Sequence, residues 1–220
     1  MRKKLLFAFA FIAVCIYGTI SLAGTHRSGS FGEKFKKQSS SSLKNGDIIF
    51  IVNPAGQGKA IQLATKSKYT HVGIVFIENG KTYVYHAVEP VSKSELEDFV
   101  GMSADGTYSV KRLKDQSVLT SSVIAQMKNE ATQKLGIHYD LGFNWSDEEL
   151  YCSEYVWKLY EHALKLEIGK PCPLKEFDLS HPKVKYIMEQ RYGKDIPYNE
   201  KMISPGDMYN STLLEDIKSQ

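Results

Sequence analysis

The hydrophobic positions of the chain follow two spacings, which predict a mixture of helices and strands. Apolar residues three or four positions apart predict helices, and short apolar runs between turn residues predict strands. The predicted helices are residues 59–68, 92–100, 118–135, 152–166 and a segment that begins after Ser180. The predicted strands are residues 47–52, 71–77, 82–88 and 107–113. The segment SPGDM near the C-terminus is predicted to be a loop. This pattern favours an α+β fold with a small antiparallel sheet packed against helices.

The dipeptide Asn79-Gly80 separates the apolar runs 71–77 and 82–88. Asn-Gly between two such runs is the strongest short-range signal for a β-hairpin with a two-residue loop. In the register that this loop sets, Glu78 faces Lys81. The sequence therefore predicts which side chains share a face of the sheet.

Two histidines fall on the same face of the predicted hairpin. His86 lies opposite Gly73, which leaves room beside the imidazole, and His71 lies opposite Val88. The two histidines are then diagonal neighbours, roughly 7–8 Å apart, a distance that long side chains can bridge. A slip of one residue would place them on opposite faces.

The first residues of the chain are typical of a secretory signal peptide. Basic residues at positions 2–4 precede an apolar run at 5–20, and Ser21 and Ala23 place small residues at a cleavage site. The run is shorter than the ~20 residues of a spanning helix, so no stable membrane span is expected after cleavage. We expect an exported protein, periplasmic or extracellular. The alternatives are an uncleaved anchor and a lipoprotein that begins at Cys15.

The remaining chain predicts one domain. Residues 1–23 form the predicted signal peptide, residues 24–43 a polar and flexible lead-in, and residues 44–220 a single domain with a core of its own. The net charge of +3 comes from the three basic residues of the signal peptide, which contains no acid. Because the mature chain is balanced in charge, no nucleic-acid partner is expected.

Cys152 lies in the first turn of a predicted helix. A thiolate is stabilised by the partial positive charge of a helix N-terminus, which can lower the thiol pKa. The alternative is a small buried core residue. Cys172 follows the far end of this helix, which is about 20 Å long. Because a disulfide needs Cα atoms within ~7 Å, we expect Cys152 to be a free thiol.

Cys152, His71 and His86 together suggest a nucleophile, a base and a group that orients the base. One alternative is a zinc site that holds these three residues and one open position, although no CxxC or HxxxH spacing supports it. A second is a domain that binds without catalysis. His138 is a further candidate for the pocket, and Glu154 is expected to be a first-turn acid that the helix dipole favours.

The segments YTHVGIVF, YVYHAVEPV and YCSEYVWKLY, in this order, resemble the circularly permuted papain-like hydrolases, and most closely the YaeF/YiiX-like amidase family. The resemblance covers residues 44–210. It implies a permuted papain-like fold, related to NlpC-type peptidases and lecithin–retinol acyltransferase-like enzymes, with Cys152 as nucleophile, His71 as base and His86 at the third polar position. Tyr139 matches a pocket tyrosine of the NlpC-type relatives. The chain lacks their GxDC motif, which argues against a peptidoglycan substrate.

The sequence therefore predicts an exported cysteine hydrolase that cleaves an amide through an acyl-enzyme, without cofactor or metal. The expected partner is a small-molecule or peptide amide, including one linked to a lipid, with substrate contacts from Tyr139, Gly73 and Tyr151. The backbone N–H of Cys152 is expected to stabilise the oxyanion. The main alternative is a lipid-directed acyltransferase or a hydrolase of acyl amides and esters.

Overall fold

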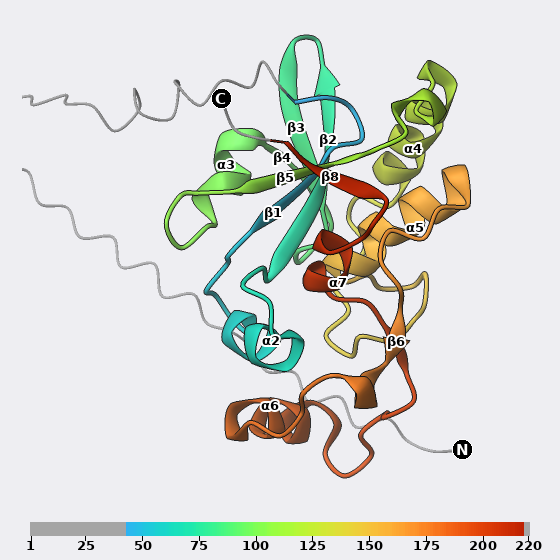
Figure 1. The fold of residues 1–220 in the computed structure, drawn as a ribbon. Helices are drawn as coiled ribbons and strands as arrows, with labels where there is room; N and C mark the ends of the chain where they lie inside the picture. Colours follow the sequence, from blue (N-terminus) through green and yellow to red (C-terminus); the bar gives the residue numbers. More distant parts are fainter. Residues whose placement is uncertain (1–42, 218–220) are drawn as a thin grey trace, which may run out of the picture.

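The computed structural model describes residues 43–217, so the predicted signal peptide and nearly all of the lead-in lie outside the described residues. A six-stranded antiparallel sheet forms the centre, in the strand order β4-β3-β2-β1-β5-β8 (Figure 1). Its strands are β1 Ile48–Ile51, β2 His71–Glu78, β3 Lys81–His86, β4 Ser92–Glu95, β5 Ser109–Leu113 and β8 Leu214–Ile217. A second sheet pairs β6, Cys172–Pro173, with β7, Lys201–Met202.

The helices pack on both faces of the six-stranded sheet and beyond one end of it. Figure 1 shows α3 on one side of the sheet, α4 and α5 on the other, and α2 beside α6 at the end where β2 begins. The helices are α2 Gly58–Thr65, α3 Leu96–Gly101, α4 Ser121–Gln133, α5 Cys152–Leu164, α6 Pro182–Tyr192 and α7 Pro205–Tyr209, with short 3₁₀ helices at Gln116–Val118 and Leu174–Glu176. The predicted α+β class is confirmed.

Two predictions of local structure are wrong. Residues 92–95, predicted to start a helix, form the edge strand β4, and the helix begins only at Leu96. An edge strand can leave its side chains partly exposed and so needs no apolar face. The polar sequence SKSE therefore carries no pattern that predicts a strand. The SPGDM segment is helical in α7, where the Ser204 side chain accepts a hydrogen bond from the Asp207 N–H, and the chain then adds β8.

The sheet separates two apolar layers. Alternate residues of β2, including Val72, Ile74 and Phe76, belong to the larger core with α4 and α5, whereas Val75 packs on the other face with Phe99 of α3. This alternation follows from the period of two along a strand. Helix α5 therefore packs on the face of β2 that carries Val72, and Val72 directly follows His71, the first residue of the strand.

The predicted register of the hairpin is confirmed. The β2–β3 pairs run from Ile74 opposite Tyr85 to Glu78 opposite Lys81. Asn79 and Gly80 have φ values of 51° and 79°, as a two-residue hairpin loop with two positive φ angles requires. The structure thus brings His86 beside the strand position that Gly73 occupies.

The neighbouring strand β3 packs tightly against Gly73. A Cβ atom at this position would lie 2.4 Å from Val84 Cγ1 and 3.2 Å from the Cβ of His86. Any larger residue must therefore push β3 or the His86 side chain away. Gly73 makes space for His86 in the sheet, and it does not line the large cavity described below.

We predict that Gly73→Ala lowers the free energy of unfolding by about 1–3 kcal/mol, because it overpacks the β2–β3 pair. Urea unfolding followed by circular dichroism measures this. Gly101→Ala is the matched control, since a Cβ there meets no atom within 4 Å. Adding Val84→Ala removes the nearest clash and should cost less in the Gly73→Ala background than in the wild type. Additive losses would contradict the contact.

In the part of the chain that the structure describes, none of the helices is both long enough and apolar enough to cross a membrane.

Candidate active site

His71 and His86 form a hydrogen-bonded pair at one end of the sheet. His71 is the first residue of β2 and His86 the last residue of β3. Their side chains meet through Nε2 of His71 and Nδ1 of His86, 2.8 Å apart. Both residues are buried, with 6% of His71 and 1% of His86 exposed. The predicted juxtaposition of the two histidines on one face is therefore present.

Two residues that the sequence reasoning missed hold this pair. Ser94 on β4 places its Oγ 3.0 Å from Nε2 of His86. Phe99 on α3 contacts both imidazoles, stacked on His71 at 5.5 Å and edge-on to His86 at 5.1 Å between ring centroids. Ser94 could not be found from the sequence, because residues 92–95 are predicted to be helical. Phe99 could not be found because its position in the pattern is that of an ordinary core residue.

The environment of the pair favours neutral imidazoles. Burial lowers the pKa of His86 from 6.5 to about 4, and burial together with the neighbouring His86 lowers the pKa of His71 well below 6.5. An imidazole needs an unprotonated nitrogen to act as a base. Both histidines are thus in the form that can accept or relay a proton at neutral pH.

The depressed pKa of His86 predicts a specific loss of stability in acid. The unfolded state binds the proton first, so the stability that neutral His86 confers above pH 6.5 is lost as the pH falls toward 4. For His86 the loss amounts to about 3 kcal/mol. We expect His86→Gln to have a flatter pH dependence of unfolding free energy over this window, measured by urea titration at several pH values.

His138→Gln is the control for that experiment. The exposed His138 donates from Nδ1 to a carboxylate oxygen of Glu89 at 2.7 Å, and this hydrogen bond raises the pKa of His138. The stability that the raised pKa of His138 provides is lost as the pH rises, which is the opposite of the effect expected of His86. If His86→Gln and the wild type lost the same stability between pH 6.5 and 4, His86 would not be a buried neutral imidazole.

Cys152 is the first residue of α5 and reaches the sheet beside His71. It is 3% exposed and belongs to the core on the α5 side of the sheet. A hydrogen bond from the Val72 backbone reaches the thiol, so the sulfur lies at the peptide that follows His71. Both described cysteines are free, which agrees with the predicted free thiol.

The thiol is neutral in the resting protein. Burial raises the pKa of Cys152 from 9.0 to about 11, and hydrogen bonds from the backbone of Val72, Ser153 and Cys152 only partly oppose it. The lowering that a helix N-terminus favours is therefore outweighed by desolvation. The structure therefore favours a neutral thiol beside neutral imidazoles at neutral pH.

Tyr139 stands beside the cysteine because the chain that precedes α5 is paired with the segment 138–140. Tyr139 and Leu150 form an isolated parallel bridge, and the Leu150 N–H donates to the His138 carbonyl at 3.1 Å. Burial, with a smaller contribution from Cys152, raises the pKa of the Tyr139 hydroxyl well above 10. Tyr139 is therefore a protonated phenol close to the thiol.

The start of α5 is anchored by a buried ion pair. Glu154 is fully buried, and its carboxylate lies 2.8 Å from the Lys158 ammonium, which also contacts Asp147 at 3.0 Å. Burial raises the pKa of Glu154 to about 7. The sequence predicted only a first-turn acid, whereas the structure gives this residue a place in the core under the cysteine.

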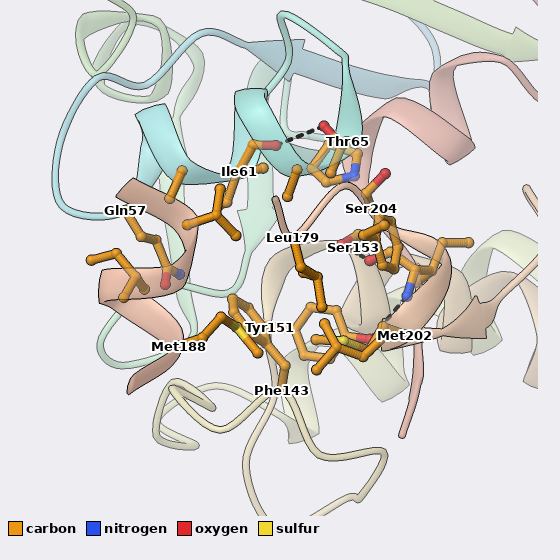
Figure 2. A pocket seen from close by; sticks show the side chains of 18 of the residues that line it. Gln57, Ile61, Thr65, Phe143, Tyr151, Ser153, Leu179, Met188, Met202 and Ser204 are labelled. Atoms are coloured by element: carbon orange, nitrogen blue, oxygen red, sulfur yellow. Dashed lines mark hydrogen bonds between the residues drawn. The ribbon is translucent and has the colours of Figure 1, made fainter. Parts of the chain in front are cut away.

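An apolar cavity opens next to the cysteine. Tyr151 and Ser153, the two neighbours of Cys152, line it, and its empty volume is about 690 Å³, part of it open to solvent. Figure 2 shows Ile61 of α2, Met188 of α6 and Leu179 among the side chains around this space. Most other lining side chains are also apolar, including Leu174, Val184, Ile187 and Met202.

Polar groups at the cavity connect to the cysteine through Tyr139. The Gln57 side chain donates to the Tyr139 hydroxyl at 3.4 Å and accepts a hydrogen bond from Arg191. Gln57 and Arg191 both line the cavity. No local pattern in the sequence marks either residue, because they come from a loop and from a helix that are far apart in the chain.

Of the other residues predicted to belong to the site, Tyr151 lies at the cavity and His138 lies outside it. Tyr151 lines the cavity, its contact with substrate stays a prediction, and its hydroxyl accepts from the Ile203 N–H at 3.2 Å. His138 does not reach the site: its side chain is 76% exposed and bonded to Glu89. Within residues 43–217, no cluster of three or more His, Cys, Asp or Glu side chains is arranged to hold a metal ion.

The fold and the order of its parts define a class of protein. The histidine lies on the second strand of the sheet and the cysteine at the N-terminus of a later helix, which is the circularly permuted order of the papain-like fold. The chain belongs to the family of permuted papain-like amidase enzymes, YaeF/YiiX, C92 family, whose model matches residues 42–218. The resemblance seen in the sequence is confirmed.

Two relatives extend this result. The chain is 41% identical over 179 residues to the uncharacterized protein YiiX of Escherichia coli strain K12, a match that covers 80% of this chain and 87% of that protein. The crystal structure of YiiX from Escherichia coli O157:H7, described as a metalloprotein, is similar with a TM-score of 0.76 and 40% identity. That match covers 80% of this chain and 97% of the crystallised chain.

Proposed function

We propose that the protein is an exported cysteine hydrolase that cleaves an amide bond, with Cys152 as nucleophile, His71 as base and His86 as the residue that orients the base. Membership of the permuted papain-like amidases supports a cysteine hydrolase in general. The observation that carries the specific assignment is the line of contacts Ser94–His86–His71, which ends at the peptide that the thiol touches.

The hydrogen bonds of the pair select which ring nitrogen acts as the base. Within residues 43–217, His71 makes a hydrogen bond only through Nε2, so Nδ1 is the nitrogen that remains for the thiol. For Nδ1 to accept a proton, the resting proton of His71 must be on Nε2, where it is donated to Nδ1 of His86. The proton of His86 is then on Nε2 and is donated to Ser94 Oγ.

The proposed reaction transfers one proton with each bond change. Cys152 Sγ attacks the carbonyl carbon as its proton moves to Nδ1 of His71, and the backbone N–H of Cys152 donates to the oxyanion. His71 then returns the proton to the leaving amine. Water attacks the thioester as His71 accepts a proton from it, and the acid leaves while the thiol regains its proton.

We predict that Cys152→Ala abolishes formation of a covalent acyl adduct and that His71→Ala slows it by about 10²–10⁴-fold, the usual contribution of a general base. His86→Ala should slow it less. The double variant His71→Ala with His86→Ala should be little slower than His71→Ala alone, because the residues act as a unit. The measurement is intact-protein mass spectrometry after incubation with a mixed library of amides and esters.

Cys172→Ala is the matched control, since Cys172 lies on β6, away from the histidines, and should leave the adduct unchanged. An adduct that survives Cys152→Ala, or full activity in His71→Ala, would contradict the proposal. The absence of any adduct with the wild type would favour a binding domain.

A second candidate is a lipid-directed acyl hydrolase or acyltransferase. The observation that favours it is the cavity beside the cysteine, whose walls are mostly aliphatic and aromatic and can take a long acyl chain. The same library separates the two candidates, because the mass of the trapped acyl group shows whether a peptidyl or a long-chain acyl group is transferred to Cys152.

A further inference from the structure

Phe143 has a backbone conformation that bulky residues rarely adopt. Its φ of 50° lies in the left-handed region, where a residue of this size is an outlier. Among residues 43–217, the other non-glycine residues with positive φ are Lys66, Asn79 and Lys165. Asn79 is in the hairpin loop, and the two lysines are the C-caps of α2 and α5, where turns commonly use this conformation. Phe143 is at neither kind of position.

Contacts from Asp140 and from α6 hold the segment around Phe143 in this conformation. The Gly142 N–H donates to the Asp140 carboxylate at 2.6 Å, and its carbonyl accepts from the Tyr192 hydroxyl of α6 at 2.6 Å. The Arg191 guanidinium, also on α6, lies 4.6 Å from the centroid of the Phe143 ring. A strained residue persists only where its surroundings fix it in this way, and such residues cluster at active sites and ligand clamps.

The Phe143 ring lies between the core that contains Cys152 and the apolar cavity. It packs against the core cluster that includes Tyr151 and Cys152. It also packs against a smaller cluster whose buried members, Val184 and Met188 among them, line the cavity. The Phe143 ring is edge-on to Tyr151, with 5.1 Å between the centroids, and both side chains line the cavity (Figure 2). An apolar substrate group in the part of the cavity at Tyr151 therefore contacts the Phe143 ring.

The structural roles open to this ring do not explain the backbone strain. Contact with the Arg191 guanidinium needs an aromatic ring, but not one on a left-handed residue. A turn that needs a positive φ is usually built with glycine or asparagine, which adopt it with little strain. The neighbouring Gly142 is not among the glycines with positive φ. The chain thus has a large ring where glycine would be unstrained, which indicates that the ring itself has a function.

We propose that Phe143 is a specificity-determining residue, whose ring limits the size of the apolar substrate group beside Cys152. The proposal rests on the function proposed above. The ring fills space that the end of a long alkyl chain would occupy, so the cavity takes a compact apolar group, such as a branched side chain or a short acyl chain. Although apolar walls alone suit either candidate function, this limit favours cleavage of a peptidyl or short acyl amide over transfer of long acyl chains.

The test compares the binding of hexanamide and decanamide, two uncharged amides that differ by four methylene groups. The parent protein is Cys152→Ala, in which no reaction takes place, and binding is measured by NMR titration. Four further buried methylene groups would favour decanamide by roughly 200-fold. We expect the parent to favour it by less than about 10-fold, because the longer chain meets the Phe143 ring. Phe143→Ala should raise the preference for decanamide at least about 10-fold.

Leu141→Ala is the matched control. Leu141 belongs to the same segment, is 63% exposed and does not line the cavity, so this variant should keep the preference of the parent. A second comparison tests the strain. Because glycine adopts a φ of 50° freely and alanine does not, Phe143→Gly should unfold at a higher urea concentration than Phe143→Ala.

The inference would be overturned by an unchanged preference in Phe143→Ala, by an equal rise in Leu141→Ala, or by no binding of either amide to the parent. A parent that favours decanamide as strongly as free burial of the chain predicts would also overturn it. Phe143→Leu decides the question if Phe143→Ala does not fold, since its smaller side chain should give a smaller rise. Acyl trapping with the wild type tests the proposed hydrolase separately, so the two failures can be distinguished.

Discussion

A hydrogen bond between two buried imidazoles, His71 Nε2 and His86 Nδ1, joins the start of β2 to the end of β3. Every other feature of the proposed site depends on it. The bond uses Nε2 of His71 and leaves Nδ1 without a hydrogen bond among residues 43–217, and it needs the hairpin register that the loop at Asn79-Gly80 sets. A slip of one residue would separate the rings. The small size of Gly73 keeps His86 in place.

Burial determines the chemistry of this site more than the helix N-terminus does. It raises the pKa of the Cys152 thiol to about 11 and lowers the pKa of both histidines, so the uncharged forms of all three groups are favoured at neutral pH. In the proposed reaction the site would therefore act as a hydroxyl–imidazole pair does, with proton transfer during attack and no thiolate formed in advance. The apolar cavity that Tyr151 and Ser153 line adjoins this buried group.

Much of the fold and part of the site could be predicted from the sequence. The hairpin, the cysteine helix and the pairing of the histidines follow from local signals: an Asn-Gly turn, helical periodicity and the period of two in strands. Ser94 was missed because an edge strand needs no apolar alternation, and α7 was missed because five residues carry little periodicity. Gln57 and Arg191 meet only through the packing of α2 on α6, which no local pattern encodes. The thiol pKa depends on how deeply the assembled core buries the sulfur.

The protonation of the imidazole nitrogens tests the central claim most directly. In protein labelled with ¹⁵N at histidine, NMR distinguishes protonated from unprotonated ring nitrogens, and His71→Ala and His86→Ala assign the signals. The account predicts that His71 and His86 are both neutral at pH 7, with the proton on Nε2 in each and Nδ1 of His71 unprotonated. A proton on Nδ1 of His71, or a charged imidazolium at pH 7, would contradict it, because His71 could then not accept the proton of the Cys152 thiol.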